Sequence, residues 1–428
     1  MLSREDNELL TRTGQGTPMG NLMRRYWIPS LLSWELPKPD SDPLRVKLLG
    51  ENLVAFRDSN GQVGMVAANC PHRGASLFFG RNEEAGLRCV YHGWKFSVDG
   101  TCVDMPNEPA ESDFRSKVRA TAYPCVERGG LIWVYMGPPE SRPELPDLEW
   151  SLVSDEQRYL SKRVQETNYA QAMEGGIDSS HVSFLHKDGA GQRGADKSLA
   201  GRYLNSDGAP KFEVVDTPYG FVIGARRQAE ADSYYWRITQ WLFPFFQMIP
   251  PFGGGPISGH AWVPIDDEHC YTFSMTWHPQ RPLTEAERAW VVEGHGVHAL
   301  KIPGTFRPVR NMTNDYLIDR EAQRLGQSFT GITGISEQDC AVQESMGAIY
   351  DRMSEHLGTS DAAIIQMRRR LLRAAAELGQ GIEPPALESS LFRVRSVSLV
   401  LPRTVVSWPE AAREAMTAAQ DRFFVSLA

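Results

Sequence analysis

Two short segments, each pairing a cysteine with a histidine, constrain this chain more than any other feature of its sequence. The first reads A-N-C-P-H-R-G-A-S-L and contains Cys70 and His72, and the second reads C-V-Y-H-G-W-K-F and contains Cys89 and His92. Sixteen residues separate the two pairs. Two thiolates and two imidazoles can bind either a zinc ion or a [2Fe–2S] cluster in which two histidines replace two cysteines on one iron. The segments therefore predict a metal centre with these four side chains as ligands.

The arrangement within each pair favours the cluster over zinc. Structural zinc motifs usually place two cysteines on one knuckle, two to four residues apart. Here each segment supplies one cysteine and one histidine, so both thiolates can bind one iron and both imidazoles the other. Pro71, Gly74 and Gly93 suit tight turns that direct backbone N–H groups towards the sulfurs.

These two segments also carry a resemblance to a known family. CPHRGASL with CVYHGWKF resembles the Rieske domain of the non-haem iron ring-hydroxylating oxygenases. The resemblance implies one [2Fe–2S] cluster per chain.

Composition and charge narrow the remaining classes. The chain has 428 residues, 41% hydrophobic and 23% charged, which suits two or three globular domains. Its net charge of −8 argues against nucleic acid as a partner, and no apolar run is long enough to predict a membrane span. The charged start, MLSREDNELL, does not resemble a signal peptide. Six cysteines are too few for a disulfide framework, so we expect a cytoplasmic protein whose other four cysteines are reduced: Cys102, Cys125, Cys270 and Cys340.

The chain divides into three regions by sequence pattern. Residues 1–40 form an N-terminal lead that we expect to pack on the catalytic domain. Residues 41–140 alternate short strands with turns and predict an all-β domain, with a strong hairpin turn at 58–61. Residues 150–428 mix strands and helices, and the helices are expected at 283–298, 337–357 and 361–378, with Arg368 on the solvated face of the last. The fold class is thus α+β, and the resemblance implies a helix-grip-type catalytic domain with an antiparallel sheet and C-terminal helices.

A second motif lies in the third region. The stretch D-S-S-H-V-S-F-L-H contains Asp178, His181 and His186. Two histidines and one carboxylate with open coordination positions form the facial triad that binds non-haem Fe(II). On a straight helix the two histidines would point about 140° apart, so the helix must end or bulge between them to bind one metal. The alternative is that all three are ordinary polar residues of an amphipathic helix.

The D-x2-H-x4-H pattern also resembles the catalytic iron motif of the same oxygenases. In that family the two histidines bind one mononuclear Fe(II), and the preceding aspartate lies between the two metal centres, which gives Asp178 a catalytic role. The family's downstream D-x4-E element matches Asp339, which we expect as the third iron ligand. Nearby carboxylates compete for that role, namely Glu337, Glu344 and Asp351.

The resemblance extends over nearly the whole chain. Three further segments resemble the phthalate 4,5-dioxygenase-like group most: M-R-R-Y-W-I-P, E-R-G-G-L-I-W-V-Y-M-G-P-P and E-G-G-I-D-S-S-H. The resemblance implies an α subunit that acts on O2 and an aromatic acid in aromatic catabolism, with a separate NAD(P)H-dependent reductase. It also implies a homotrimer, or stacked trimers, in which Asp178 links the cluster of one chain to the iron of the next. Arg237 is the residue that we expect to bind the acid, with Arg226 and Arg227 as alternatives. Five aromatic residues could line the pocket or form plain core: Trp236, Trp241, Phe243, Phe245 and Phe246.

Three activities remain open from the sequence. The first is dihydroxylation of an aromatic acid to a cis-dihydrodiol, and the second is O-demethylation of a methoxylated or ether-linked aromatic acid. The third is an electron-transfer Rieske protein without catalysis, which the D-x2-H-x4-H pattern disfavours because a carrier needs no second iron site.

Overall fold

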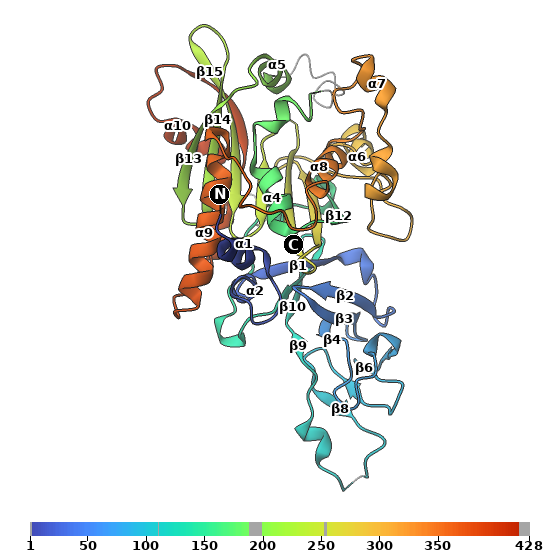
Figure 1. Cartoon of the computed structure of the whole chain (residues 1–428). Helices are drawn as coiled ribbons and strands as arrows, with labels where there is room; N and C mark the ends of the chain where they lie inside the picture. The colour runs from blue at the N-terminus through green and yellow to red at the C-terminus, as the bar shows by residue number, and fades with distance from the viewer. Residues whose placement is uncertain (1, 110, 188–198, 252–254, 419–428) are drawn as a thin grey trace.

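The computed structural model describes residues 2–109, 111–187, 199–251 and 255–418. Figure 1 shows a lower lobe made of small sheets and an upper body built around one large sheet. The predicted fold class, an N-terminal β domain followed by a domain with an antiparallel sheet and C-terminal helices, is confirmed.

Two antiparallel sheets of short strands form the lower lobe. The first has the order β2-β3-β4-β9, with strands Leu44–Leu48, Glu51–Arg57, Val63–Ala67 and Ala122–Tyr123. The second has the order β5-β6-β7-β8, with strands Arg81–Glu83, Gly86–Arg88, Lys95–Phe96 and Cys102–Asp104. The predicted hairpin turn joins β3 to β4, and Asp58 closes it by accepting the N–H groups of Asn60 and Gln62 through its carboxylate. A separate apolar core fills the space between the sheets.

A third, three-stranded sheet connects the lobe to the body. Its order is β1-β11-β10, with strands Trp27–Leu32, Leu131–Tyr135 and Cys125–Arg128. Strand β1 comes from the N-terminal lead and is fully buried. Helices α1 (Arg4–Thr11) and α2 (Pro18–Met23) precede it and contact helix α9 (Ala362–Leu378) of the body. The lead thus packs on the body at one end and enters a sheet with β11 at the other.

The body contains one eight-stranded antiparallel sheet. Its order is β12-β18-β17-β16-β15-β14-β13, and β19 pairs with β15. The strands span Arg158–Gln165, Cys270–Trp277, Ile257–Pro264, Phe246–Ile249, Ser233–Leu242, Gly220–Gln228, Lys211–Thr217 and Val397–Pro402. Helix α4 (Tyr169–Ile177) covers one face through contacts with β17, and α10 (Trp408–Met416) packs beside β19 on the other side, where Trp408 stacks on Trp236. Figure 1 shows α4 and α8 (Ile335–Glu344) adjacent in the centre of the body.

The remaining helices are short. They are α3 (Glu149–Leu152), α5 (Leu199–Ser206), α6 (Glu285–Val292) and α7 (Arg320–Arg324). Helix α6 begins where the sequence predicts, with Thr284 and Glu287 forming the capping box, but it ends at Val292 rather than near residue 298.

Two helix predictions require correction. The helix expected over 337–357 is α8, which ends at Glu344, because the chain turns at Gly347 with φ of 88°. Arg368 was expected on the solvated face of α9, yet its side chain is buried between the carboxylates of Glu174 and Glu355. No helix among the described residues is long and apolar enough to cross a membrane.

Candidate metal centres

The two cysteine–histidine pairs form a matched pair of tight turns in the lower lobe. In the first, the N–H of Cys70 donates to the carbonyl of Ala75, and the N–H of Gly74 donates back to the carbonyl of Cys70 at 2.9 Å. The second turn repeats this pattern with Cys89 and Gly93, also at 2.9 Å. Both glycines need their left-handed backbone, with φ of 75° and 80°. Local geometry therefore presents each pair of donors in the same way.

The donor atoms in these turns fit a thiolate- and imidazole-bound cluster. Burial, with the Cys89 thiol nearby, raises the pKa of Cys70 to about 11, so the thiolate needs a bound cation to form at neutral pH. The rings of His72 and His92 lie 4.4 Å apart, and Trp94 stacks on His72 at 4.3 Å. The Nδ1 atom of His72 is buried without a hydrogen-bond partner in the described part of the chain, as expected for an atom that ligates a metal.

The body contains a second group of side-chain atoms that could bind a metal. The Nε2 atoms of His181 and His186 lie 3.1 Å apart, and the Oδ1 atom of Asp339 lies 3.7 Å from the first and 3.1 Å from the second. Three such atoms within 4.8 Å of one another can bind one metal ion. The structure thus brings together two histidines and one carboxylate from segments that are far apart in the sequence, in the combination that suits non-haem Fe(II).

Helix α4 ends just before the two histidines, so the problem of helical spacing does not arise. Asp178 is the C-cap of α4, and the chain then turns through a short 3-10 segment, His181–Ser183, before reaching His186. The Oδ1 atom of Asp178 accepts the N–H of Ser180 at 2.6 Å, and its Oδ2 atom lies 3.2 Å from Nδ1 of His181. A carboxylate can only accept here, so the proton of His181 resides on Nδ1 and its Nε2 lone pair faces the centre.

Two glycines allow α4 to approach its neighbours closely. A Cβ atom on Gly175 would lie 2.0 Å from the side chain of Gln343 on α8. A Cβ atom on Gly176 would lie 2.0 Å from the ring of Trp262 on β17. The E-G-G-I-D-S-S-H sequence therefore places the end of α4 against both the helix and the sheet that complete the site.

The competing carboxylates do not join the three donors. Glu344 accepts the N–H of Glu166 and the hydroxyl of Tyr316. Asp351 is exposed. Glu337 is buried, and burial raises its pKa to about 7. Its Oε2 atom has no hydrogen-bond partner among the residues described, but it is not part of the group that converges with the histidines.

Two buried arginines adjoin the end of α4. Arg237 donates to the hydroxyls of Ser179 at 3.0 Å and Thr239 at 3.3 Å. Arg227 donates to the carbonyl of Ser179 at 3.0 Å, while its Nη1 atom is buried and unpartnered within the described ranges. Burial lowers the pKa of Arg237, and the Asp178 carboxylate acts in the opposite direction. Arg226 instead contacts the ring of Tyr234 at 4.5 Å, away from the site.

Sequence reasoning missed three buried polar residues of the body. His260 is buried on β17 beside Ser274, and burial, then Arg163, lowers the pKa of His260 to about 3, so its ring stays neutral. His298 is buried between the hydroxyls of Ser161 and Thr276. A lone histidine carries no pattern that would have marked either one. Gln338 lies 2.8 Å from Nδ1 of His186, and its position just before Asp339 was the available signal.

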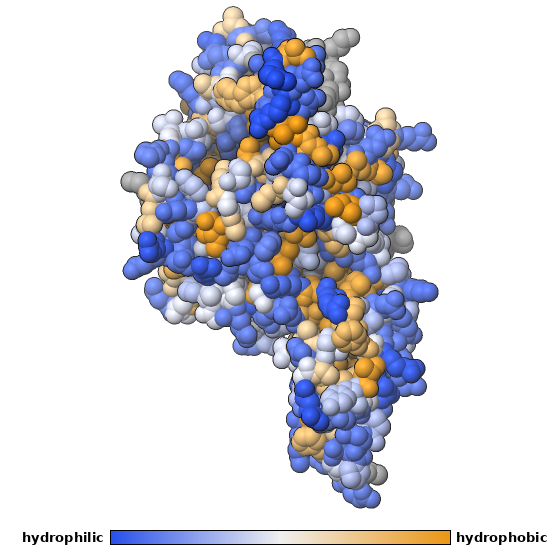
Figure 2. Space-filling model, turned by 45° about the vertical axis from the view of Figure 1, so that its right-hand side comes forward, coloured by the Kyte–Doolittle hydropathy of each residue, from blue (hydrophilic) through white to orange (hydrophobic). Residues whose placement is uncertain are grey.

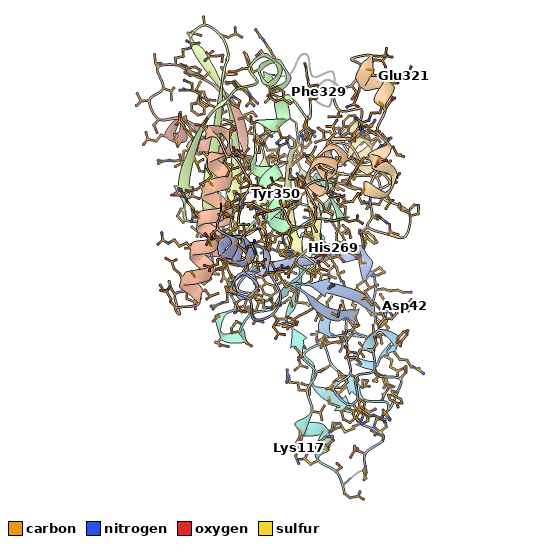
Figure 3. The ribbon with its side chains drawn as sticks, in the orientation of Figure 1. Asp42, Lys117, His269, Glu321, Phe329 and Tyr350 are labelled. Carbon is orange, nitrogen blue, oxygen red and sulfur yellow. The ribbon has the colours of Figure 1, made fainter. Side chains whose placement is uncertain are left out.

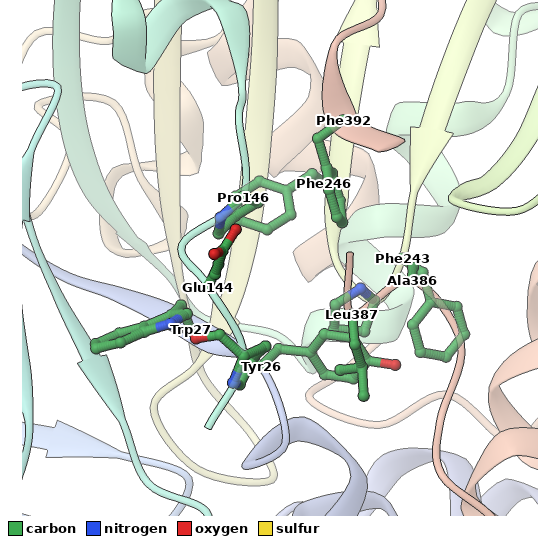
Figure 4. A pocket seen from close by; sticks show the side chains of 11 residues that line it. Tyr26, Trp27, Glu144, Pro146, Phe243, Phe246, Ala386, Leu387 and Phe392 are labelled. Carbon is green, nitrogen blue, oxygen red and sulfur yellow. Dashed lines mark hydrogen bonds between the residues drawn. The ribbon is translucent and has the colours of Figure 1, made fainter. Parts of the chain in front are cut away.

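The five aromatic residues that could line the pocket or form plain core are all buried in apolar cores. Trp236 stacks on Trp408 of α10, and Trp241 lies in the main core against Met173. Phe245 is also in that core. Phe243 and Phe246 line a separate apolar pocket between the N-terminal lead and the segment around Phe392, shown in Figure 4. None of the three converging side chains, His181, His186 and Asp339, lines that pocket.

Two family models cover almost the whole chain. The model described as the Rieske [2Fe-2S] domain matches residues 26–124, which decides between the cluster and zinc. The model described as LigXa C-terminal domain like matches residues 134–421.

Similar proteins include oxygenase subunits of known systems. The 3-chlorobenzoate-3,4-dioxygenase oxygenase subunit of Comamonas testosteroni is 41% identical and covers 96% of this chain and 98% of its own length. The phthalate 4,5-dioxygenase oxygenase subunit of Pseudomonas putida is also 41% identical, over 89% of this chain and 88% of its own. The 5,5'-dehydrodivanillate O-demethylase oxygenase subunit of a Sphingobium species is 32% identical over 98% of this chain and 90% of its own length. Among solved structures, dicamba monooxygenase bound to dicamba shares the fold with a TM-score of 0.59 at 18% identity, covering 84% of this chain and 99% of that one.

Proposed function

This chain belongs to the Rieske non-haem iron oxygenases as the oxygenase subunit of an aromatic ring-hydroxylating system, and we propose that its substrate is a phthalate-like aromatic acid. The proposed reaction converts the acid, O2, NAD(P)H and a proton to a cis-dihydrodiol and NAD(P)+. The electrons come from a separate NAD(P)H-dependent reductase. Since such a reductase works where NAD(P)H and reduced thiols are present, we place the system in the cytoplasm.

We assign the metal ligands to the two convergent sets of donors. Cys70, His72, Cys89 and His92 hold the [2Fe–2S] cluster, and His181, His186 and Asp339 hold a mononuclear Fe(II). When bound, the cluster supplies single electrons and the iron supplies open positions for O2 beside the substrate. The protein itself holds each histidine ligand in one tautomer and positions the acid.

The two centres lie in different parts of one chain, which supports an assembly of several chains. Figure 1 shows the cluster lobe at the lower end and α4 with α8 in the upper body. Apolar side chains are exposed beside each centre: Val90 at 58% and Tyr91 at 55% beside His92, and Phe184 at 53% between the two histidines of the body. Figure 2 shows that exposed apolar side chains occur on both the lobe and the body of one face. We therefore propose a homotrimer, or stacked trimers, in which the lobe of each chain contacts the body of the next in a closed ring.

Asp178 is the residue that we propose to link the centres across this interface. Its Oδ2 atom accepts from His181, and its side chain is 21% exposed at the surface of the body. A carboxylate in this position can also accept an N–H from His72 or His92 of a neighbouring chain. It would then orient one imidazole at each centre.

The buried arginines are the observation that carries the choice of an acid. Neither Arg237 nor Arg227 has a carboxylate ion-pair partner among the described residues, and both border the iron site. A buried cation without a counter-ion is costly, and a substrate carboxylate would relieve that cost. Arg237 is the better placed of the two guanidinium groups because its charge acts on the pKa of His186, whereas Asp178 acts on the pKa of both arginines.

Replacing Arg237 tests this assignment. Arg237→Gln should raise KM for an aromatic acid roughly 10- to 100-fold, the range expected for losing a charge-assisted hydrogen bond. Arg226→Gln is the matched control, because its guanidinium stacks on Tyr234 and not on the iron site. An unchanged KM in Arg237→Gln, with the protein folded, contradicts the role.

Single turnover tests the reaction itself. The iron-loaded protein is reduced chemically, freed of reductant and mixed with O2 and a panel of benzoates, phthalates and methoxybenzoates, and the products are identified by mass. A product heavier by two oxygens and two hydrogens supports dihydroxylation. No product from any acid, with three irons bound per chain, contradicts the substrate class.

O-demethylation is the second candidate, since the relatives include an O-demethylase as well as dioxygenases. Its reaction converts a methoxy-aromatic acid, O2, NAD(P)H and a proton to a phenol, formaldehyde, water and NAD(P)+. Formaldehyde among the products of the same single-turnover panel would identify O-demethylation, rather than dihydroxylation, as the reaction. A pure electron carrier would contain two irons per chain rather than three, so iron analysis distinguishes it from either oxygenase.

A further inference from the structure

His181 and His186 have different hydrogen-bond partners behind them. Nδ1 of His181 faces the carboxylate of Asp178 at 3.2 Å, whereas Nδ1 of His186 faces the side-chain amide of Gln338 at 2.8 Å. Both partners act on the ring nitrogen that points away from the centre. One imidazole therefore has a charged acceptor behind it and the other a neutral one.

The orientation of the Gln338 amide follows from its other neighbours. Its Nε2 atom lies 2.8 Å from the carbonyl of Ile332 and 3.0 Å from the hydroxyl of Thr330. A backbone carbonyl can only accept, so the NH2 group must face Ile332. The Oε1 atom then has to face His186, and it too can only accept. Every hydrogen-bonding group of this side chain is thus assigned by its surroundings.

This orientation decides the tautomer of His186. Because Oε1 only accepts, the ring proton must reside on Nδ1, and the lone pair of Nε2 is left to face His181 and Asp339. If the amide were absent, the ring could place its proton on Nε2 and donate it to the Asp339 carboxylate 3.1 Å away. That hydrogen bond would use the same two atoms that should bind the metal.

We propose that Gln338 is a positioning residue that holds His186 in the metal-binding tautomer, with a neutral amide where His181 has a carboxylate. The proposal rests on the assignment of His186 as an iron ligand. Gln338 is buried at 4% exposure and lies on α8, one residue before Asp339, so it holds one ligand from the helix that supplies another. The loop that its NH2 group binds begins next to Phe329, near the top of the body in Figure 3.

Metal affinity tests the role without depending on turnover. The mononuclear metal is removed with a chelator, retention of the cluster is checked by its visible absorption, and Co2+ is titrated by calorimetry. Gln338→Met keeps the size of the side chain but removes the acceptor, and it should weaken Co2+ binding about 10- to 100-fold. Gln366→Met is the matched control on α9, since the Gln366 amide bonds to Asp216 and not to a ligand or to the end of α4. Its Co2+ affinity should stay at the wild-type value.

Gln338→Glu separates positioning from simple packing. The glutamate keeps an acceptor for Nδ1 of His186 but loses the donor to Ile332, so it should lower the urea midpoint while binding Co2+ at least as tightly as the wild type. A parallel loss of urea midpoint and Co2+ affinity in Gln338→Glu would overturn the proposal. So would a Co2+ affinity of Gln338→Met within twofold of the wild type, or an equal loss of affinity in Gln366→Met. Absence of Co2+ binding by the wild type would instead refute the iron-site assignment on which the proposal rests.

Discussion

The two metal centres of this protein are built in opposite ways. The donors of the lower lobe come from two turns between residues 70 and 92, and each turn is closed by its own backbone hydrogen bonds. The donors of the body come from the end of α4 and from α8, more than 150 residues further along, and only the packing of α4, α8 and β17 brings them together. A locally built site depends on turn geometry, whereas an assembled site depends on the tertiary structure around it.

The sharpest test of this contrast removes one ligand from each centre. Cys89→Ala should abolish the cluster and reduce the iron content from three to one per chain, while Co2+ still binds in the body. Asp339→Ala should leave the visible spectrum of the cluster unchanged and reduce the content from three to two. Iron analysis with visible absorption measures both. Loss of both centres in either variant would show that they fold as one unit.

The next largest effect is expected from the residue proposed to connect the centres. Asp178→Asn keeps the size of the side chain but removes the charge that orients the imidazoles, so turnover should fall roughly 100-fold. Both metals should remain bound, because neither set of ligands is changed and the asparagine keeps an oxygen that can accept from Nδ1 of His181. Stopped-flow oxidation of the reduced cluster, with substrate present, measures the transfer directly. Full turnover in this variant would exclude the bridge.

The same contrast explains what the sequence could predict. Cys70 and His72 are two residues apart, so their spacing alone predicts a tight turn that holds both side chains close together. The set formed by His181, His186 and Asp339, which converge in the structure, could be predicted from the sequence. The end of α4 at Asp178 and the contact of Gln338 with His186 could not. Those features depend on segments that meet only in the folded chain.

The helix predictions failed for related physical reasons. The end of α8 at Glu344 depends on a turn at Gly347, which the helical pattern up to residue 357 concealed. Arg368 looked like surface charge because its partners, Glu174 and Glu355, lie elsewhere in the sequence. Buried ion pairs between distant segments leave no local pattern in the sequence that would predict them.

A more modest effect is expected from crowding the end of α4. Gly176→Ala would place a methyl group 2.0 Å from the ring of Trp262, which is buried and has little room to move. Overpacking of this kind costs about 1 to 3 kcal/mol in the free energy of unfolding. Co2+ affinity in the body should fall as well, while the visible spectrum of the cluster should not change.

Gly358→Ala is the control for that substitution. A Cβ atom there would lie 3.9 Å from its nearest neighbour, and the residue is exposed, so the free energy of unfolding should stay the same or rise by about 0.5 kcal/mol. Urea unfolding measures both variants. Equal stability of Gly176→Ala and Gly358→Ala would mean that the close packing of α4 does not hold the site.

The junction between the two regions should give the smallest effect, and it depends on pH. Asp266, in the turn between β17 and β18, lies 2.7 Å from Nζ of Lys47 on β2, and the N–H of Leu49 donates to Pro264 beside it. Figure 3 places His269 of the same turn at this junction. Burial opposes ionisation, but hydrogen bonds from Lys47 and His269 lower the pKa of Asp266 to about 2. Its contribution is therefore complete above the ordinary value near pH 3.8 and is lost as the pH falls towards 2.

Asp266→Asn measures that contribution. Because the ion pair is partly solvated, the variant should lose only about 1 kcal/mol in the free energy of unfolding at pH 7. The difference from the wild type should stay constant down to about pH 4 and vanish near pH 2, whereas Asp42→Asn, at an exposed site on the lobe, should show no difference at any pH. Urea midpoints over this range provide the measurement. A difference that persists at pH 2 would assign the effect to packing, and the junction would then be held by its backbone hydrogen bonds rather than by charge.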